Sequence, residues 1–181
     1  MPIRDEEILA AAQALAGSLA QQRLLVTTAE SCTAGGIAEP LTGIAGASAW
    51  FDRGFVTYSN EAKLSMLGVS QSTLDRFGAV SEATALEMAR GAISHSGAHV
   101  SVAVTGIAGP DGGTPDKPVG TVWIAWGRSE NLHSVCLQLP FDRQGFQLWV
   151  AALAQELLRR EVLGISGLPS LVQRYRRGGS I

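Results

Sequence analysis

The chain opens with a segment in which apolar side chains recur every three or four residues, the spacing of one face of a helix. We therefore predict an amphipathic helix over residues 5–22. Its apolar positions are Ile8, Leu9, Ala12, Leu15 and Leu19. A β-prone run, RLLVTT at residues 23–28, comes next, and residues 34–42 favour a second helix that Pro40 interrupts. Residues 50–59 (WFDRGFVTYS) are again β-prone.

Three helices are expected in the middle of the chain. Ser59 or Asn60 can cap the first, which ends at Gly68 because glycine accepts the left-handed conformation that closes a helix. Residues 70–78 predict a short helix with a glycine stop. Ser81 caps a longer helix, with an acidic residue in its first turn that suits the helix dipole.

The last part of the chain is predicted to hold three strands and a helix. Residues 100–106 alternate valine with smaller residues, which is typical of a strand. A long loop rich in glycine and proline, residues 106–120, separates it from residues 121–127 and 133–140, which we expect to form an antiparallel pair. A helix rich in leucine and alanine follows over residues 144–163.

This order of elements predicts an α/β domain with a mixed, mostly parallel sheet. Strands and helices alternate first, and then two adjacent strands appear, so one strand is expected to be antiparallel to its neighbours. We expect a single domain over residues 1–165 and a basic, flexible tail over residues 166–181. The loop at residues 106–120 is longer than most connections, and such loops in compact domains are functional or disordered.

Composition narrows the classes of protein that fit this pattern. The chain has 181 residues, 46% of them hydrophobic, and a formal net charge of −2. Nucleic-acid binding needs many Lys or Arg side chains on phosphates, so we expect no nucleic-acid partner. No apolar run approaches the roughly 18 residues of a membrane span, and we expect no membrane partner. Two cysteines make no disulfide framework and the start has no apolar signal core, so we expect a cytoplasmic protein.

The densest candidate chemistry lies in residues 27–36, TTAESCTAGG, where a strand gives way to a helix. Ser31 at such a junction is either a helix N-cap or a nucleophile whose oxyanion is stabilised by neighbouring amides. Cys32 is a rival nucleophile, since a helix N-terminus lowers the pKa of a thiol. Glu30 suits a general base, an organiser of hydrogen bonds or a charge that complements the helix dipole.

Two further segments carry candidate side chains. In GFVTYSNEAK, Tyr58 and Lys63 flank a helix start, and Lys63 is either a solvated helix lysine or a base paired with Ser31. In the loop at residues 106–120, glycines allow backbone amides to approach an anion and Lys117 adds charge, although the loop matches neither GxxxxGK[ST] nor GxGxxG. A plain surface loop is the alternative.

The histidines give no sign of a metal site. His95, His99 and His133 are not grouped with cysteines or carboxylates in the way that a catalytic zinc site with three protein ligands requires. We therefore expect no metal, and no motif in the chain indicates a cofactor.

Four stretches of the chain, in this order, resemble the CinA C-terminal domain family: TAESCTAGG, GIAGASAWFDRGFVTYSNEAK, GAVSEATALEMARGA and TGIAGPDGGTPDKPVGTVW. The resemblance runs from about residue 5 to about residue 160. Stand-alone members of that family are nicotinamide-nucleotide amidohydrolases. The resemblance implies a three-layer α/β/α fold and a homodimer. It also implies hydrolysis of nicotinamide mononucleotide (NMN) to nicotinate mononucleotide and ammonia, in pyridine-nucleotide recycling.

The same resemblance implies roles for individual residues. Ser31 matches the nucleophile, and Tyr58 and Lys63 match the residues that activate it. The residues implied to bind the substrate are Gly46, Ser48, Thr105 and Arg143, the last as a phosphate contact. We also expect Glu30 and Gly106 among the residues of the substrate site. The chain departs from the family pattern at Ala34, Ala47, Phe141 and Gln147. The last two of these departures affect the phosphate contacts expected beside the arginine.

Hydrolysis of an amide by Ser31 places a demand on Lys63. A lysine accepts a proton only when it is neutral, so its reference pKa of about 10.4 must fall by roughly 3 units for action near pH 7. Burial and the cationic pyridinium ring of the substrate both act in that direction. A carboxylate nearby would raise the lysine pKa, so we expect Glu30 to organise the loop. The alternative function is a non-catalytic module that binds pyridine nucleotides.

Overall fold

Five strands form a single sheet in the computed structural model, which describes residues 5–177. The strands are β1 (Val26–Glu30), β2 (Phe51–Val56), β3 (Val100–Gly106), β4 (Thr121–Arg128) and β5 (Asn131–Gln138), in the spatial order β2-β1-β3-β4-β5. β1 pairs in parallel with β2 and with β3, whereas β3–β4 and β4–β5 are antiparallel. The mixed sheet is confirmed: β4 alone runs against the other strands, although parallel and antiparallel neighbours are equal in number.

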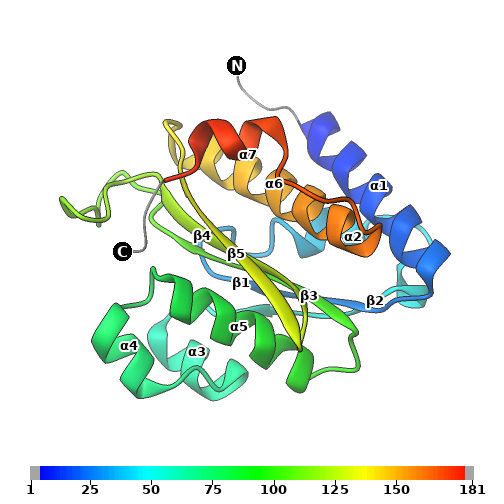
Figure 1. Cartoon of the computed structure of the whole chain (residues 1–181), viewed down its shortest axis with the longest axis horizontal. Helices are drawn as coiled ribbons and strands as arrows, with labels where there is room; N and C mark the ends of the chain where they lie inside the picture. Colours follow the sequence, from blue (N-terminus) through cyan, green and yellow to red (C-terminus); the bar gives the residue numbers. More distant parts are fainter. Residues whose placement is uncertain (1–4, 178–181) are drawn as a thin grey trace.

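Helices cover both faces of the sheet, which confirms the α/β/α layers (Figure 1). They are α1 (Asp5–Gln22), α2 (Ala38–Thr42), α3 (Asn60–Leu67), α4 (Gln71–Phe77), α5 (Glu82–Ser94), α6 (Arg143–Val162) and α7 (Ser170–Tyr175), with a short 3-10 helix at Ala47–Ala49. α1, α2, α6 and α7 lie on one face, and α3, α4 and α5 lie on the other. Strand alternation divides the core in the same way, because Val102 and Val104 face α1 and α6 while Ala103 faces α5.

The caps predicted at Ser59 and Ser81 and the glycine stops at Gly68 and Gly78 are present, and Ser70 forms a further cap that we did not predict. The side chains of Ser59, Ser70 and Ser81 accept hydrogen bonds from the backbone N–H three residues on, which begins α3, α4 and α5. Gly68 ends α3 in the left-handed conformation, with φ 67°, and Gly78 ends α4. These local signals therefore fixed the helix boundaries correctly.

The segment after β1 differs from its prediction. Residues 31–37 form successive turns and α2 begins only at Ala38, whereas we expected a helix from Ala34. The backbone turns because Ala34 and Gly35 take positive φ values of 52° and 102°. Pro40 then lies in the first turn of α2, where a missing N–H costs no helical hydrogen bond.

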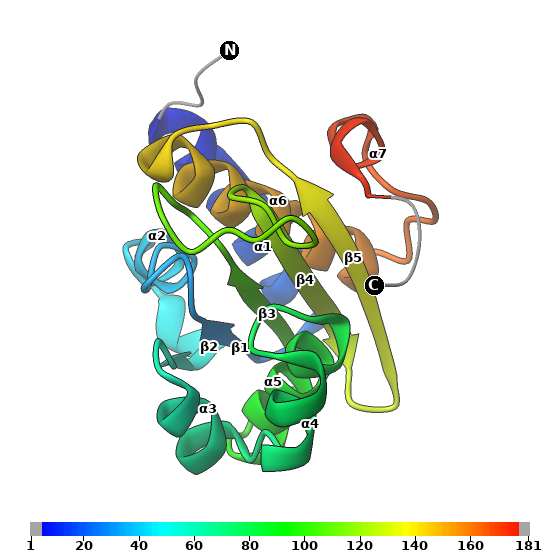
Figure 2. The same ribbon diagram turned by 90° about the vertical axis from the view of Figure 1, so that its left-hand side faces the viewer.

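The segment that we expected to be a flexible tail, residues 166–181, contains the helix α7. Val172 is fully buried, and Arg176 forms an antiparallel bridge with Leu137 of the outer strand β5. Figure 2 shows α7 beside that strand. Apolar packing and a sheet edge with free backbone groups explain this order. Residues 178–181 lie outside the described part of the chain.

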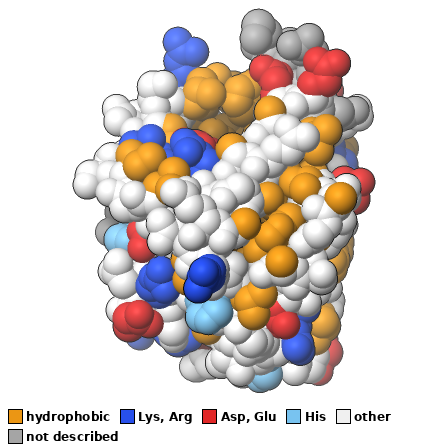
Figure 3. Space-filling model, turned by 90° about the vertical axis from the view of Figure 1, so that its right-hand side faces the viewer, with side chains coloured by type: hydrophobic (Ala, Val, Ile, Leu, Met, Phe, Trp, Pro, Cys, Tyr) orange, Lys and Arg blue, Asp and Glu red, His pale blue; other side chains and the backbone are white. Residues whose placement is uncertain are grey.

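The two ends of the sheet have different surroundings. Figure 2 faces the end where β1 and β3 finish, with the loop at residues 107–120 crossing in front of it. Figure 3 faces the opposite end, where charged side chains of both signs are interspersed among hydrophobic ones. Between residues 5 and 177, no helix has the length and apolar character needed to cross a bilayer.

Candidate active site

A cleft of about 220 Å³ lies at the carboxyl ends of β1 and β3. Most of the residues that we predicted from sequence line it: Ser31, Tyr58, Lys63, Thr105, Gly106 and Arg143. This is the position in which open α/β sheets bind ligands, beyond the carboxyl ends of parallel strands. The topology thus gathers residues that are far apart in the sequence.

Ser31 and Lys63 form a buried pair at the floor of this cleft. Lys63 comes from the first turn of α3, is 1% exposed, and its Nζ lies 3.0 Å from Ser31 Oγ. The same Nζ donates to the carbonyl oxygen of Thr57 at 2.7 Å and approaches that of Tyr58 at 3.5 Å. Two acceptors therefore fix the amine while its third direction points at the hydroxyl.

The environment of Lys63 lowers the pKa of its amine towards neutral pH. Burial away from water lowers its pKa from 10.5 to about 8, against a smaller opposing effect of the Cys32 sulfur. In its neutral form the amine has a lone pair that can accept the Ser31 proton. The drop that amide hydrolysis requires is therefore largely supplied before any substrate binds.

Cys32 is poorly suited to act as the nucleophile. The residue is 4% exposed, and burial raises the pKa of its thiol to about 12, so the thiolate is scarce at neutral pH. Helix α2 begins six residues later, so the helix N-terminus that would have lowered this pKa is absent from the position. The geometry favours Ser31 over its neighbour.

Glu30 organises the loop that carries Ser31. Its carboxylate is fully buried and accepts hydrogen bonds from two threonine hydroxyls and from three backbone N–H groups. The donors are Thr28 Oγ1, Thr33 Oγ1, Gly35 N, Ile37 N and Ala38 N, at 2.6–3.3 Å. With both oxygens engaged by its own loop, Glu30 does not line the cleft, which agrees with the organising role that we expected and not with a place among the substrate-binding residues.

The oxyanion donors lie in the turn after Ser31 rather than in a helix. The amides of Gly35, Ile37 and Ala38 are already engaged by Glu30. Among the described residues 5–177, the N–H groups of Cys32 and Thr33 donate no hydrogen bond to another residue, and that of Cys32 contacts only its own sulfur. These two groups follow the nucleophile directly and can donate to a developing oxyanion.

Tyr58 and Arg143 form the outer rim of the cleft. Tyr58 is 61% exposed, and its hydroxyl accepts a hydrogen bond from Arg143 at 3.2 Å instead of touching the lysine amine. Arg143, the first residue of α6, also donates to the carbonyl oxygen of Gly109 at 2.9 Å. The backbone of Tyr58 thus helps to hold Lys63, whereas its ring belongs to the rim.

The inner wall is built by the end of β3. Thr105 Oγ1 donates to the carbonyl oxygen of Ala79 at 2.8 Å and so holds the loop that precedes α5. A side chain at Gly106 would come within 2.7 Å of the Thr121 carbonyl oxygen, so the strand pair requires glycine here. The amino ends of α5 and α6 both approach this cleft, and their dipoles favour an anion.

Gly46 and Ser48 are not brought to the cleft within one chain. They lie just before β2, where the Trp50 carbonyl accepts from the first N–H of β1, Val26. Because β1 and β2 are parallel, the residues that precede β2 lie at the opposite end of the sheet from Ser31. Lys117 is also elsewhere, since its Nζ donates to the Phe77 carbonyl at the end of α4.

Sequence reasoning missed two contributions to the site. One is a backbone carbonyl group, and the other is Gln147, which we had noted only as a departure from the family pattern. The Thr57 carbonyl holds Lys63, and a carbonyl leaves no signal in the residue type. Gln147 donates to the carbonyl oxygen of Cys32 at 2.9 Å and so joins α6 to the loop of the nucleophile. Only its position four residues after Arg143, on the same face of α6, could have indicated this.

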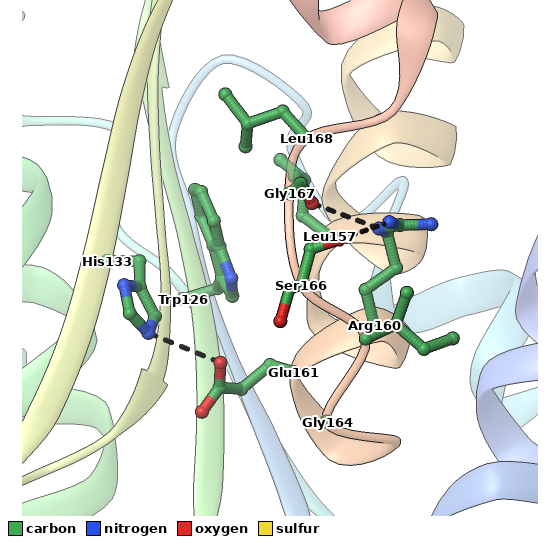
Figure 4. A pocket seen from close by; sticks show the side chains of 10 residues that line it. Trp126, His133, Leu157, Arg160, Glu161, Gly164, Ser166, Gly167 and Leu168 are labelled. Atoms are coloured by element: carbon green, nitrogen blue, oxygen red, sulfur yellow. Dashed lines mark hydrogen bonds and ion pairs between the residues drawn. The ribbon is translucent and has the colours of Figure 1, made fainter.

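A larger cavity, of about 490 Å³, lies at the far end of α6 from the cleft (Figure 4). Trp126 and His133 project into it from β4 and β5, and His133 Nε2 lies 3.3 Å from a carboxylate oxygen of Glu161. The guanidinium of Arg160 is directed to backbone carbonyl oxygens of the next turn. Among its described residues no nucleophile is paired with a base, in contrast to the Ser31–Lys63 pair of the smaller cleft.

Comparison with known proteins shows the family to which this chain is similar. The family model for the CinA C-terminal domain matches residues 9–162. Nicotinamide-nucleotide amidohydrolase PncC of Enterobacter agglomerans is 52% identical over 139 residues, which cover 76% of this chain and 85% of that protein. The PncC protein of Escherichia coli K12 is 53% identical over 122 residues, 67% of this chain and 74% of that protein.

A longer relative and a solved structure also match this chain over most of its length. A CinA-like protein of Colwellia psychrerythraea is 48% identical over 161 residues, and the chain spans 37% of its length. The crystal structure of competence/damage inducible protein CihA from Agrobacterium tumefaciens superposes with a TM-score of 0.82 at 46% identity. That match covers 87% of this chain and 97% of that one.

Proposed function

Because the chain belongs to the CinA C-terminal domain family, we propose that it is an amidohydrolase that converts NMN and water to nicotinate mononucleotide and ammonia. The observation that carries the proposal is the 3.0 Å approach of a buried lysine amine, with a pKa near 8, to the Ser31 hydroxyl. Relatives that are 52–53% identical to this chain carry the name nicotinamide-nucleotide amidohydrolase, which supports the choice of substrate.

The first half of the reaction forms an acyl-enzyme. Neutral Lys63 accepts the hydroxyl proton while Ser31 Oγ attacks the carboxamide carbon, and the N–H groups of Cys32 and Thr33 donate to the oxyanion. The tetrahedral intermediate collapses when Lys63, now an ammonium, returns a proton to the departing nitrogen. Ammonia leaves, and Lys63 is neutral again.

The second half uses the same groups in the same order. Lys63 takes a proton from water, the resulting hydroxide attacks the acyl carbon, and Ser31 leaves with the proton from Lys63. The products are nicotinate mononucleotide and free enzyme, so atoms and charges balance. The cationic ring of the bound substrate favours the neutral form of the lysine throughout.

The phosphate of the substrate requires donors at the rim. Arg143 is placed to release the Tyr58 hydroxyl and to bind a phosphate in its place, because a charge-assisted hydrogen bond is stronger than one to a neutral phenol. The amino ends of α5 and α6 add to the same positive field. We extend the proposal to a cytoplasmic homodimer that serves pyridine-nucleotide recycling.

The test is ammonia release from NMN by wild type and by two single variants. Ser31→Ala should release none above background while still binding NMN in equilibrium dialysis, and Cys32→Ala should remain active. Activity in Ser31→Ala together with its loss in Cys32→Ala would move the nucleophile to the thiol. Binding of NMN by wild type with no ammonia release would identify a non-catalytic pyridine-nucleotide module.

A further inference from the structure

The segment after α6 lies beyond the residues matched by the family model, yet it contacts two elements that border the cleft. That match ends at residue 162, whereas the helix α7 and the residues after it continue to Arg177. Val172 anchors α7 in the main core with no exposed surface. Leu137 bridges to Arg176, and the Arg177 N–H donates to the Cys136 carbonyl at 3.0 Å, so this segment continues along the outer edge of β5.

One contact of this segment reaches the start of α6. The ring of Tyr175 lies edge-on to that of Phe141, at 6.0 Å between centroids, and Phe141 stacks on Trp149 at 5.5 Å. Phe141 directly precedes Asp142, which caps α6, and Arg143, which forms the rim of the cleft. Two aromatic contacts therefore hold Phe141, which lies two residues before the arginine of the rim.

A second contact reaches the opposite wall. The guanidinium of Arg177 donates to the carbonyl oxygen of Asp116 at 3.1 Å and approaches Thr121 Oγ1 at 3.4 Å. Both belong to the long loop or its end, and the same loop supplies Gly109, whose carbonyl accepts from Arg143. Tyr175 of α7 thus contacts the residue that precedes the Asp142 cap, and Arg177 contacts the loop whose Gly109 carbonyl accepts from Arg143.

We infer that Tyr175 and Arg177 are positioning residues for substrate binding, acting through Phe141 and through the loop at residues 107–120 on Arg143. The inference rests on the proposed function for its kinetic readout. Neither residue touches the Ser31–Lys63 pair, so their loss moves the phosphate contact and leaves the reacting atoms in place. This account also gives a role to Phe141, a departure from the family pattern.

The kinetic test compares Tyr175→Ala and Arg177→Ala with wild type, well below the melting temperature of each. Each should raise KM for NMN by roughly 2- to 10-fold with kcat within twofold, because one ring contact or one hydrogen bond to a rim element is lost. Tyr175→Phe keeps the ring and should restore KM. Arg174→Ala is the matched charge control, since Arg174 lies in α7 and contacts no acceptor within residues 5–177.

A second measurement does not depend on turnover. Amide hydrogen exchange of residues 107–120 and 141–146 should become faster in both variants and stay unchanged in Arg174→Ala. Wild-type KM and unchanged exchange in both variants would overturn the inference, as would a fall in kcat alone. If wild type releases no ammonia, the proposed function fails and the exchange comparison decides this inference by itself. Should Tyr175→Ala not fold, Arg177→Ala, a change at the end of the described chain, provides both readouts.

Discussion

Replacement of Lys63 by methionine tests the central chemical claim, because it removes the amine while keeping a chain of similar length. General-base catalysis contributes typically 10²–10⁴ in rate, so kcat for NMN should fall by roughly that factor. Lys117→Met is the matched control: it removes the only other lysine of the chain, whose amine contacts the Phe77 carbonyl outside the cleft. That variant should keep wild-type kcat.

The pH profile of wild-type kcat/KM tests the pKa of Lys63 without any substitution. With a pKa of about 8, roughly a tenth of Lys63 is neutral at pH 7 and half is neutral at pH 8. The logarithm of kcat/KM should therefore rise with a slope near one from about pH 6.5 and level off above about pH 8. The profile of kcat should have a lower midpoint, because the pyridinium charge in the complex lowers the lysine pKa further.

Replacing Lys63 should change stability in the opposite sense to activity. The folded pKa of Lys63, about 8, lies below its ordinary value of 10.5. The unfolded chain therefore binds the extra proton between these two pH values, and stability rises with pH across that window. At pH 7 the burial of Lys63 therefore lowers the free energy of unfolding. Lys63→Met should remove it and raise the free energy of unfolding by about 1–2 kcal/mol, after allowance for solvent screening and for the donor lost by the Thr57 carbonyl.

Stopped assays of ammonia release between pH 6.5 and 9.5 measure the kcat of Lys63→Met and the pH profile of wild type. Thermal melts at each pH measure the change in stability. A flat profile of kcat/KM across that range, or turnover by Lys63→Met within tenfold of wild type, would refute the assignment of Lys63 as the base. A variant that is inactive and also less stable than wild type at pH 7 would show that the lysine pKa is not depressed.

Three further predictions concern neighbouring buried groups. Glu30→Gln leaves several donors of the Ser31 loop without an acceptor and should lower stability by about 2–3 kcal/mol, roughly 5–10 °C in melting temperature, while the exposed Glu39→Gln should not. Gln155 of α6 is fully buried, and neither its amide nitrogen nor its amide oxygen has a hydrogen-bond partner in the described protein. Gln155→Leu should therefore raise the melting temperature by roughly 2–6 °C. A decrease would show that the amide is satisfied. Cys32→Ala should keep kcat within about threefold of wild type in the ammonia assay, because its thiol is protonated at neutral pH.

The parts of the fold that could be predicted from sequence are those specified by neighbouring residues. Ser59, Ser70 and Ser81 begin helices because each side chain satisfies an amide only three residues away. The turns at residues 31–37 escaped prediction because a carboxylate holds their amides up to eight residues along the chain. Such a contact forms only once the loop has closed on Glu30, so helical spacing gives no sign of it.

The candidate site shows the same limit at longer range. From the residues, a pair of Ser31 and Lys63 was only one of two alternatives, and the resemblance favoured it. Their 3.0 Å contact depends on where the fold places the start of α3 relative to the end of β1. Gly46 and Ser48 were placed in the site by the same resemblance, yet the predicted parallel strands already implied otherwise. A crossover from β1 to a parallel β2 must return to the starting end of the sheet, so residues just before β2 cannot adjoin residues just after β1.

Strand alternation explains how one short stretch carries both an acid and a nucleophile beside a lysine that must be neutral. The Ser31 N–H donates to the Val104 carbonyl, so the strand geometry of β1 continues to the nucleophile and successive side chains point to opposite faces. Glu30 therefore faces α2 and its own loop, whereas Ser31 faces α3 and Lys63. A carboxylate on the lysine side would raise the lysine pKa towards or above its ordinary value. Because Glu30 lies on the other face and is surrounded by five donors, it does not oppose the lowering of the Lys63 pKa by burial. The residue next to the nucleophile can therefore stabilise the loop while the lysine keeps a lowered pKa.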